Sequence, residues 1–316
     1  MIQKDKIVDS KIAVIGSNMV DLITYVDRMP ITGETVEAPR FEMGFGGKGS
    51  NQAAAAAKLG SPVLMVGKVG DDAFGQNTLG NYRNLGIDAR YVAVVPGVSS
   101  GVAPIFVTPE GENSILIVKG ANGALSPADI DAAAQDLKDC DLILLQLEIP
   151  LETVYHAIDF AAYYGIKVLL NPAPATRELD IGRIAKVDFF VPNQTELQIL
   201  TGLPCDTIAE AEAAARRLIE RGMGRVIVTL GGDGALLVGP EGTILTPPVK
   251  VAPVDTTGAG DAFIGSFAHH YVESGDIEAA LKGAAAYAAQ SILKPGTQKA
   301  LATRAEFDAF LADLQN

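Results

Sequence analysis

The sequence predicts an α/β fold: a three-layer α/β/α core with a mostly parallel central sheet, and a small β-sheet lid. Three observations lead to this prediction. Short apolar runs alternate with alanine-rich runs of helical pattern, which is typical of a parallel sheet covered by helices on both faces. Two further segments have an extended pattern without a helix, so they do not fit inside a doubly wound sheet. No linker or shift in composition divides the 316 residues. We therefore expect one domain over 1–316, with lid segments at about 17–46 and 98–120.

The core elements follow one another as successive strands and helices. A strand at 11–15 ends at Gly16, and an alanine-rich helix at 51–59 ends at Gly60, since glycine is common just past a helix end. The other predicted strands are short, nearly continuous apolar runs, and they lie at 63–66, 139–147, 167–170, 188–191 and 225–230. The other predicted helices lie at 152–164 and 209–221.

The lid is predicted from the two helix-free segments. Residues 21–46 contain the alternating stretch TVEAPRFEM, and residues 101–119 read GVAPIFVTPEGENSILIVK. The second segment predicts a hairpin, because two apolar runs flank the turn-forming residues PEGEN.

Composition and charge argue against several classes of function. The formal net charge of −13 disfavours nucleic-acid binding through the overall field. Cys140 and Cys205 are too few for a disulfide framework or a four-thiolate metal site. His269 and His270 are neighbours on a helical pattern and point about 100° apart, so they give no metal-binding spacing. Residues 1–10 lack the apolar stretch of a secretory signal, and no run reaches the ~20 apolar residues of a membrane span. We therefore expect a cytoplasmic protein without nucleic-acid or membrane partners.

The strongest motif is VDTTGAGDAFIG at 254–265. A strand-like run at 249–254 leads into a glycine-rich turn and then into a helix with apolar residues at helical spacing. Three backbone N–H groups would be presented at the start of this helix, those of Gly258, Ala259 and Gly260. Such a group of amides binds the negative charge that develops on a transferring phosphoryl group. Asp261 would stand beside it and could accept the proton of an alcohol nucleophile. Taken alone, the motif also fits an ordinary helix cap.

A second motif, GFGGKGSNQ at 44–52, enters the alanine-rich helix. Its glycines allow the backbone to approach a ligand, and Lys48 and Asn51 add hydrogen-bond donors. It is not a Walker A loop, because Gly49 follows Lys48 where that loop requires Ser or Thr. Taken alone, it also fits a flexible turn with a solvated lysine.

Two further motifs follow apolar strands. In PNQTE at 192–196, Asn193 and Glu196 lie three residues apart on one face of a starting helix. This spacing suits a capping box, and it also suits residues that organise phosphate and Mg²⁺; both interpretations can hold. The segment TLGGDG at 229–234 is either a loop on the nucleotide side or a tight turn.

Together these segments resemble the ribokinase-like carbohydrate kinase family over about 12–311. The resemblance rests on GGKGSN at 46–51 and DTTGAGD at 255–261, which occur in this order. It implies transfer of the γ-phosphoryl group of ATP to a sugar hydroxyl, with Asp261 as the general base and the amides of 258–260 as the anion hole. It also implies a homodimer formed through the lid, as is frequent in this family.

The resemblance further implies which residues bind the reactants. The sugar would be bound by Met19, Asp21, Gly47, Lys48, Gly49, Ser50, Asn51, Glu148 and Asp261. The nucleotide would be bound by Asn193, Glu196, Thr229, Leu230, Gly231, Gly232, Asp233, Gly234, Gly260 and Ala285. A K⁺ ion would be held, mainly through backbone carbonyls, by Asp255, Thr257, Ser291, Lys294, Gly296 and Ala300. Ala300 stands where a serine is expected, which weakens the case for K⁺. Mg²⁺ would arrive with the nucleotide and need few protein ligands.

Within the family, the sugar is argued from GSNMVD at 16–21, where Met19 takes the place of the Asn in the N-x-D of ribokinases. A thioether packs against a C–H surface but does not donate a hydrogen bond, and a buried unpaired polar group costs about 1–3 kcal/mol. This favours a sugar that lacks one hydroxyl, 2-deoxy-D-ribose, phosphorylated at its 5-hydroxyl. The surrounding segments resemble the bacterial deoxyribokinase branch of the family. One alternative is a ribokinase in which Met19 only packs. The other is a sugar or nucleotide sensor on a kinase scaffold, although an intact Asp261 argues against a sensor.

Overall fold

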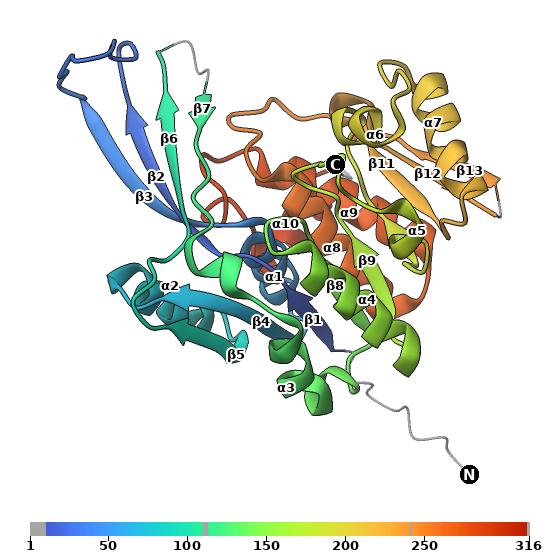
Figure 1. Ribbon diagram of the computed structural model, residues 1–316. Coiled ribbons are helices and arrows are strands. Elements are labelled where there is room, and N and C mark those ends of the chain that lie inside the picture. Colours follow the sequence, from blue (N-terminus) through green and yellow to red (C-terminus); the bar gives the residue numbers. More distant parts are fainter. Residues whose placement is uncertain (1–10, 110–112, 241, 315–316) are drawn as a thin grey trace.

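The computed structural model describes residues 11–109, 113–240 and 242–314. Within them, a large sheet with helices on both faces forms the body, and a small separate sheet stands off it (Figure 1). The predicted α/β core and β-sheet lid are therefore confirmed. Residues 1–10, from which we predicted that there is no secretory signal, lie outside the described part of the chain.

The body is built on a nine-stranded sheet. Its strands are β1 (Ile12–Ile15), β4 (Val63–Gly70), β5 (Asp88–Val95), β8 (Leu142–Leu145), β9 (Lys167–Leu170), β10 (Phe189–Phe190), β11 (Val226–Thr229), β12 (Ala235–Gly239) and β13 (Gly242–Thr246). Their order is β13-β12-β11-β10-β9-β8-β1-β4-β5. Every adjacent pair from β11 to β5 is parallel, and β12 and β13 pair antiparallel at the other edge. The central strands are apolar throughout because both of their faces are covered.

Helices cover the sheet in two layers. One face carries α3 (Pro127–Leu137), α4 (Leu151–Tyr164), α5 (Ile181–Ile184), α6 (Gln194–Thr201) and α7 (Ile208–Glu220). The other face carries α1 (Lys48–Lys58), α2 (Ala73–Asn84), α8 (Ala259–Ser274) and α9 (Ile277–Ser291), with α10 (Arg304–Asp313) packed on α9. Two short 3₁₀ turns are η1 (Gly120–Ala124) and η2 (Gly231–Asp233). Alternate residues of β1 supply the two cores, Ala13 and Ile15 to the first layer and Ile12 and Val14 to the second.

The lid is a four-stranded sheet of order β3-β2-β6-β7. Its strands are β2 (Met19–Tyr25), β3 (Arg40–Gly46), β6 (Val102–Val107) and β7 (Asn113–Ile115), so both predicted lid segments contribute to it. Strands β6 and β7 pair antiparallel, which confirms the hairpin, although residues 110–112 of its turn lie outside the described residues. Strand β2 joins the two segments, antiparallel to β3 and parallel to β6.

Several predicted boundaries change in the structure. Helix α1 begins three residues earlier than predicted, because Gly47 takes a left-handed conformation (φ 86°) and starts the helix at Lys48. The strand predicted at 139–147 is confined to Leu142–Leu145, since residues 139 and 140 turn back onto the end of α3. The strand predicted at 249–254 is wrong, because these residues have no regular secondary structure. Pro253 lacks a donor for a ladder, and the Val254 N–H bonds the Ile292 carbonyl beyond α9 instead.

Within the described residues, no helix combines the length and the apolar character that crossing a membrane would require.

Candidate active site

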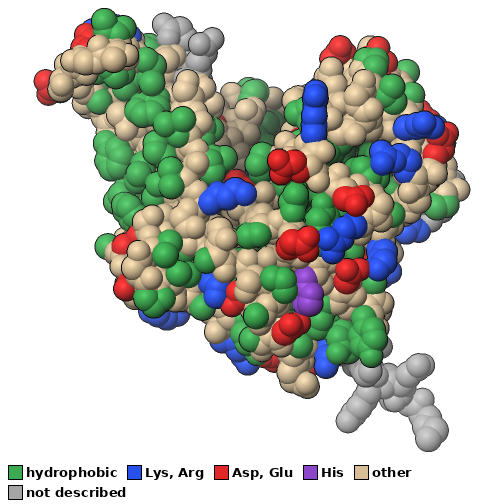
Figure 2. Space-filling model, viewed as in Figure 1, with side chains coloured by type: hydrophobic (Ala, Val, Ile, Leu, Met, Phe, Trp, Pro, Cys, Tyr) green, Lys and Arg blue, Asp and Glu red, His purple; other side chains and the backbone are tan. Residues whose placement is uncertain are grey.

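Polar side chains gather where the parallel strands of the body end. Ser17 follows β1, Glu148 follows β8, Asn171 follows β9 and Asn193 follows β10. Because the carboxyl ends of parallel strands meet at one edge of a sheet, these residues converge there. Asn171 and Asn193 line a cavity of about 190 Å³ at this edge. A larger hollow of about 940 Å³ lies between the inner face of the lid and the body. Figure 2 shows the lid projecting from the body at the upper left.

The smaller cavity holds most of the predicted catalytic groups. Its lining consists of Lys48, Asn171, Ala173, Val191, Asn193, Glu196, Thr229, Thr256, Gly258, Ala259, Gly260, Asp261 and Ile264. Two signatures more than 200 residues apart in the sequence, at 46–51 and 255–261, therefore meet at one site. Helices α1 and α8, which they begin, pack directly against each other.

Asp261 lies buried in the first turn of α8, with 8% of its surface exposed. Its Oδ2 accepts a hydrogen bond from the Asn51 side-chain amide at 2.9 Å, and its Oδ1 accepts one from the Gln52 side-chain amide at 3.0 Å. Each carboxylate oxygen therefore has an amide donor. A carboxylate held in this way, at the wall of the cavity, is suited to accept a proton from a bound hydroxyl.

The three residues predicted to form the anion hole lie at the N-terminus of α8. Gly258 caps the helix in a left-handed conformation (φ 79°), so the turn requires glycine. The Ala259 N–H donates to the Thr256 carbonyl at 3.2 Å, which corrects the prediction that all three amides are free. Among the described residues, no partner is found for the N–H groups of Gly258 and Gly260. These two line the cavity and, with the positive end of the helix dipole, suit a phosphate group.

Glu148 is fixed by groups from two other segments. Its Oε2 accepts hydrogen bonds from the Ser17 hydroxyl at 2.5 Å and from the Lys48 backbone amide at 2.9 Å. The side chain is 4% exposed. Glu148 thereby joins the end of β1 to the start of α1, next to the predicted sugar position.

Asp21 lies on the inner face of the lid and lines the larger hollow. Burial raises the pKa of its carboxyl to about 6, with Glu148 and Asp261 adding to this effect and a hydrogen bond from Thr297 opposing it. The Thr297 hydroxyl lies 3.3 Å from Asp21 Oδ2 and 2.9 Å from the Phe45 carbonyl. Gly46 leaves room for this carboxylate, since a Cβ there would come within 2.1 Å of Asp21 Oδ1.

Lys48 is the cation of the smaller cavity. Burial lowers the pKa of its ammonium, but the carboxylates of Asp261, Glu148 and Glu196 outweigh burial and raise the net pKa above its ordinary value. Lys48 is therefore charged at neutral pH. Within the described residues its ammonium has no hydrogen bond or ion pair, which leaves it free for an anionic ligand.

The other residues predicted at the start of α1 act through the backbone or through contacts inside the protein. A Cβ at Gly47 or at Gly49 would come within 2.7 Å of backbone atoms of residues 17–19, so both glycines allow α1 to approach β1 closely. The Ser50 hydroxyl accepts a hydrogen bond from the Gln298 amide at 2.9 Å, which directs Ser50 away from the smaller cavity.

Met19 lies two residues before Asp21 on β2, so the two side chains share one face of the lid sheet. Met19 is 3% exposed and packs against Ala103 and Ile105 of β6. Across the sheet it is paired with Gly46. The sheet next to Asp21 is therefore apolar on its inner face.

The predicted nucleotide residues lie on the other side of the cavity. Asn193 and Glu196 form the predicted capping box of α6: the Glu196 amide donates to Asn193 Oδ1 at 2.8 Å, and the Asn193 amide donates to Glu196 Oε2 at 2.9 Å. Both also line the cavity, so the structural and the ligand-binding interpretations are compatible. Burial raises the pKa of Glu196, with Asp261 adding to it, while the Asn193 amide and Lys48 oppose it.

The loop after β11 joins this side of the site. Thr229 bridges to Asn193 and lines the cavity, and η2 holds Gly231, Gly232 and Asp233 at the surface. Gly234 must be glycine, because its φ is 93° and a Cβ would come within 2.1 Å of the Thr246 carbonyl oxygen. The Leu230 and Ala285 side chains pack against the apolar clusters on the two faces of the sheet. Leu230 is thus confined to backbone contacts with a ligand, and the nucleotide role of both residues stays a prediction.

Of the residues predicted to hold K⁺, the structure brings Asp255, Thr257 and Gly296 into contact with one another. Asp255 accepts hydrogen bonds from the Thr257 amide at 2.9 Å and the Gly296 amide at 2.8 Å. These bonds outweigh burial and hold the pKa of Asp255 below its usual range. Ala300 is buried and contributes no side-chain oxygen, while the Ser291 hydroxyl donates to the Ala288 carbonyl. Lys294 points to Glu306, 3.8 Å away.

Three residues that the sequence analysis did not select take part in the site: Gln52, Thr297 and Gln298. Gln298 donates to Asn51 Oδ1 at 3.1 Å and accepts from the Asn81 amide at 2.9 Å, and Thr297 reaches the lid. Gln52 directly follows the predicted GGKGSN segment, so its position was a signal that could have been used. Thr297 and Gln298 lie about 250 residues from their partners, and no local pattern marks them.

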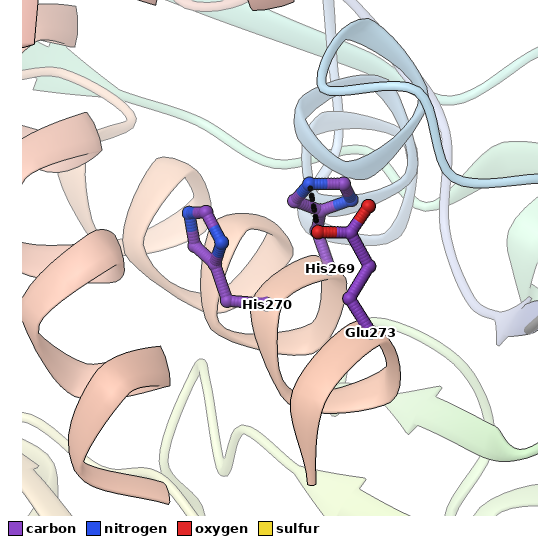
Figure 3. Close-up of side chains that lie close together, drawn as sticks. All are labelled: His269, His270 and Glu273. Atoms are coloured by element: carbon purple, nitrogen blue, oxygen red, sulfur yellow. Dashed lines mark ion pairs between the residues drawn. The ribbon is translucent and has the colours of Figure 1, made fainter. Parts of the chain in front are cut away.

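A second cluster lies on the C-terminal half of α8, away from the cavity (Figure 3). Ligand atoms of His269, His270 and Glu273 lie within 4.8 Å of one another, closer than the sequence argument about helix faces implied. However, His269 Nδ1 lies 2.8 Å from the Ser61 hydroxyl, and its Nε2 lies 3.3 Å from the Arg304 guanidinium. The same guanidinium lies 3.9 Å from Glu273 Oε1, so a permanent cation already contacts two of the three groups. Burial, followed by Arg304, lowers the pKa of His269 to about 4, and we assign the cluster to packing between α8 and α10.

Comparison with known proteins agrees with this geometry. Residues 9–304 match the family model described as pfkB family carbohydrate kinase. The chain is 59% identical to a deoxyribokinase of Salmonella typhi over 301 residues, covering 95% of this chain and 98% of that protein. It is 41% identical to a ribokinase of Bacillus subtilis over 301 residues, covering 95% and 99%.

Solved structures agree as well. The ribokinase of Arabidopsis thaliana complexed with ribose and ATP superposes with a TM-score of 0.88 at 31% identity, covering 96% of this chain and 98% of that one. The ribokinase of Thermotoga maritima gives a TM-score of 0.85 at 35% identity, covering 95% and 99%. With both signature segments assembled around one buried carboxylate, the chain belongs to the pfkB family of carbohydrate kinases.

Proposed function

We propose that this carbohydrate kinase transfers the γ-phosphoryl group of ATP to the 5-hydroxyl of 2-deoxy-D-ribose. The observation that carries the choice of sugar is Met19, buried against Ala103 and Ile105 on the lid face that also presents Asp21. An apolar surface beside a sugar-binding carboxylate suits a sugar carbon that carries no hydroxyl. The 59% identity to a deoxyribokinase supports the same choice over the ribokinase alternative.

The chemistry is assigned to the cavity around Asp261. The sugar 5-hydroxyl gives its proton to Asp261, its oxygen bonds to the γ-phosphorus, and the bond from that phosphorus to ADP breaks. The amides of Gly258 and Gly260 and the ammonium of Lys48 stabilise the charge that develops on the phosphoryl oxygens. Asp21 and Glu148, on the lid and at the end of β8, hold the remaining sugar hydroxyls.

Two ions belong to this proposal. Glu196, a carboxylate on the cavity wall, would help to hold Mg²⁺ carried by the nucleotide, and this ion would neutralise part of the phosphate charge. K⁺ is assigned to the loops around Asp255, whose ionised carboxylate fits a cation. Since Ala300 supplies no hydroxyl, the K⁺ site would rest mainly on backbone carbonyls and bind more weakly than a site with serine there.

The lid is proposed to join two copies of the chain. Its inner face, which carries Asp21, lines the hollow, whereas Phe41 and Leu116, which do not line it, are 54% and 62% exposed. Phe41 is paired with Thr24, so it lies on the face opposite Asp21. Light scattering of the wild type and of Phe41→Asp tests this: a dimer is expected, and a monomeric wild type would refute it. A cytoplasmic location stays a prediction.

The sugar is tested by measuring kcat/KM for 2-deoxy-D-ribose and D-ribose at the same ATP and K⁺ concentrations. We expect the wild type to prefer deoxyribose by roughly 5- to 150-fold, the value of one unpaired buried hydroxyl. Met19→Asn should shift the ratio toward ribose by a similar factor. Met19→Leu, which keeps the apolar contact, is the matched control and should not. Preference for ribose in the wild type would favour the ribokinase alternative, and binding without phosphorylation of either sugar would favour the sensor.

A further inference from the structure

The two amides that hold Asp261 differ in their surroundings. Asn51 and Gln52 are neighbours on α1 and reach different oxygens of the carboxylate. Asn51 Oδ1 is held by Gln298, a residue that lines the hollow under the lid. Gln52 has no exposed surface at all. One donor therefore borders the sugar region, whereas the other is part of the protein interior.

Gln52 is fixed in one orientation by a chain of buried amides. The Gln146 amide donates to Gln52 Oε1 at 2.6 Å, so the NH₂ group of Gln52 must face Asp261. That group also lies 3.3 Å from Asn171 Oδ1, and the Asn171 amide in turn donates to the Val191 carbonyl at 2.9 Å. Gln146 is also fully buried. The chain links α1 to the ends of β8, β9 and β10, the rigid part of the body.

We propose that Gln52 is the positioning residue of the reaction, holding Asp261 Oδ1 so that Oδ2 is the oxygen that takes the proton. On this proposal Asn51 leaves Oδ2 when sugar binds, and Oδ2 accepts the hydrogen of the 5-hydroxyl while the new O–P bond forms and ADP departs. Gln52 stays in place and keeps the carboxylate aimed at the sugar. The proposal deepens the function proposed above, since it requires Asp261 to be the base.

The test compares two buried glutamines of the same chain. Gln52→Met keeps the approximate volume and removes the donor to Asp261. Gln290→Met, the matched control, removes a buried amide on α9 that, among the described residues, bonds neither Gln52 nor Asp261. We expect Gln52→Met to lower kcat about 10- to 100-fold, because a misplaced catalytic group has a cost of this order, with KM for sugar within about 3-fold of wild type. Gln290→Met should keep kcat within about 5-fold. Thermal unfolding of both variants establishes that they fold.

The pH profile separates positioning from a general loss of packing. An amide donor favours the ionised carboxylate, so the acidic limb of the kcat profile should move to higher pH in Gln52→Met and not in Gln290→Met. The charged groups facing Asp261 are Lys48, Asp21 and Glu196, and both variants leave them unchanged. Should Gln52→Met fail to fold, Gln52→Asn withdraws the amide by one methylene and replaces it in the comparison.

Two results would overturn the proposal. One is a Gln52 variant with the kcat and the pH profile of the wild type, and the other is an equal loss of kcat in the Gln52 variant and in the control variant. Failure of the proposed function looks different, because Asp261→Asn would then retain activity or deoxyribose would not be a substrate.

Discussion

The proposed sugar side and the proposed nucleotide side of the site are built in opposite ways. On the sugar side, buried side chains reach across the fold, with hydrogen bonds from Asn51 to Asp261, from Ser17 to Glu148 and from Thr297 toward Asp21. These partners lie 131 to 276 residues apart in sequence. On the nucleotide side, Asn193 and Glu196 bond each other within one helical turn, and the glycine-rich loop around η2 lies at the surface.

This difference predicts which single substitutions should have large effects on stability and catalysis. Buried polar groups that lose a partner are left unsatisfied, at a cost of about 1–3 kcal/mol, whereas exposed groups regain their hydrogen bonds from water. Variants on the sugar side should therefore change both stability and catalysis, and variants on the nucleotide side should have small effects on each.

The largest effect is expected for Asp261→Asn. Removing a general base typically lowers the rate by about 10²–10⁴-fold, which we expect in kcat for deoxyribose. An asparagine here would also turn one NH₂ group toward the amide donors of Asn51 or Gln52, so we expect a loss of about 1–3 kcal/mol in the free energy of unfolding. Steady-state kinetics measures kcat, and urea unfolding measures the free energy of unfolding. A variant retaining more than half of wild-type kcat would show that Asp261 is not the base.

Asp21→Asn should have the next largest effect, and its two consequences have opposite signs. Loss of a charged hydrogen-bond partner should raise KM for sugar by about 10–100-fold. In the wild type, KM for sugar should fall as pH rises through about 6, where Asp21 ionises, and this dependence should vanish in the variant.

The stability of this variant should increase. The pKa of Asp21 rises from 3.8 to about 6 on folding, so between these values the folded protein binds more protons than the unfolded chain. Its stability therefore falls as pH rises through this window and stays lower above it. The Asp21→Asn variant has no carboxyl to ionise and would not lose this stability. We therefore expect its free energy of unfolding at pH 7 to be about 1–3 kcal/mol higher than that of the wild type. Urea unfolding should show this gain at pH 7 and a smaller one at pH 4. No gain at pH 7 would contradict the assignment of a buried ionised carboxylate.

The same contrast between the two sides explains what the sequence could predict. The central strands, helix α7 and motifs such as Asn193–Glu196 were found because their signals lie within a few residues of one another. The sequence analysis missed Thr297 and Gln298 because their partners lie far away in the chain. It placed three free amides at 258–260 because the bond from Ala259 to Thr256 depends on how the turn folds. The run at 249–254 has strand composition, but Pro253 and the bond from the Val254 N–H to the Ile292 carbonyl leave it irregular.

Thr297→Val tests whether the long-range contacts on the sugar side act through single hydroxyls. The variant keeps the shape and removes the group that bonds the Phe45 carbonyl and approaches Asp21. We expect KM for sugar to rise about 3- to 10-fold, the value of roughly one hydrogen bond, with kcat within about 2-fold. Thr297→Ser retains the hydroxyl and should behave as wild type. If KM for sugar were the same in Thr297→Val and in the wild type, Thr297 would take no part in sugar recognition.

The smallest effect is expected on the nucleotide side, for Asn193→Ala. Loss of the N-cap of α6 should lower the free energy of unfolding by about 1 kcal/mol, and loss of a polar group from the cavity wall should raise KM for ATP by roughly 2- to 5-fold. The chain offers a matched control in Thr207, which forms the same capping box with Glu210 at the start of α7 and does not line the cavity. Thr207→Ala should give a similar loss of stability and leave KM for ATP unchanged. Equal KM values for ATP in the two variants would mean that Asn193 only caps α6, and that nucleotide binding rests on the backbone of the surrounding loops.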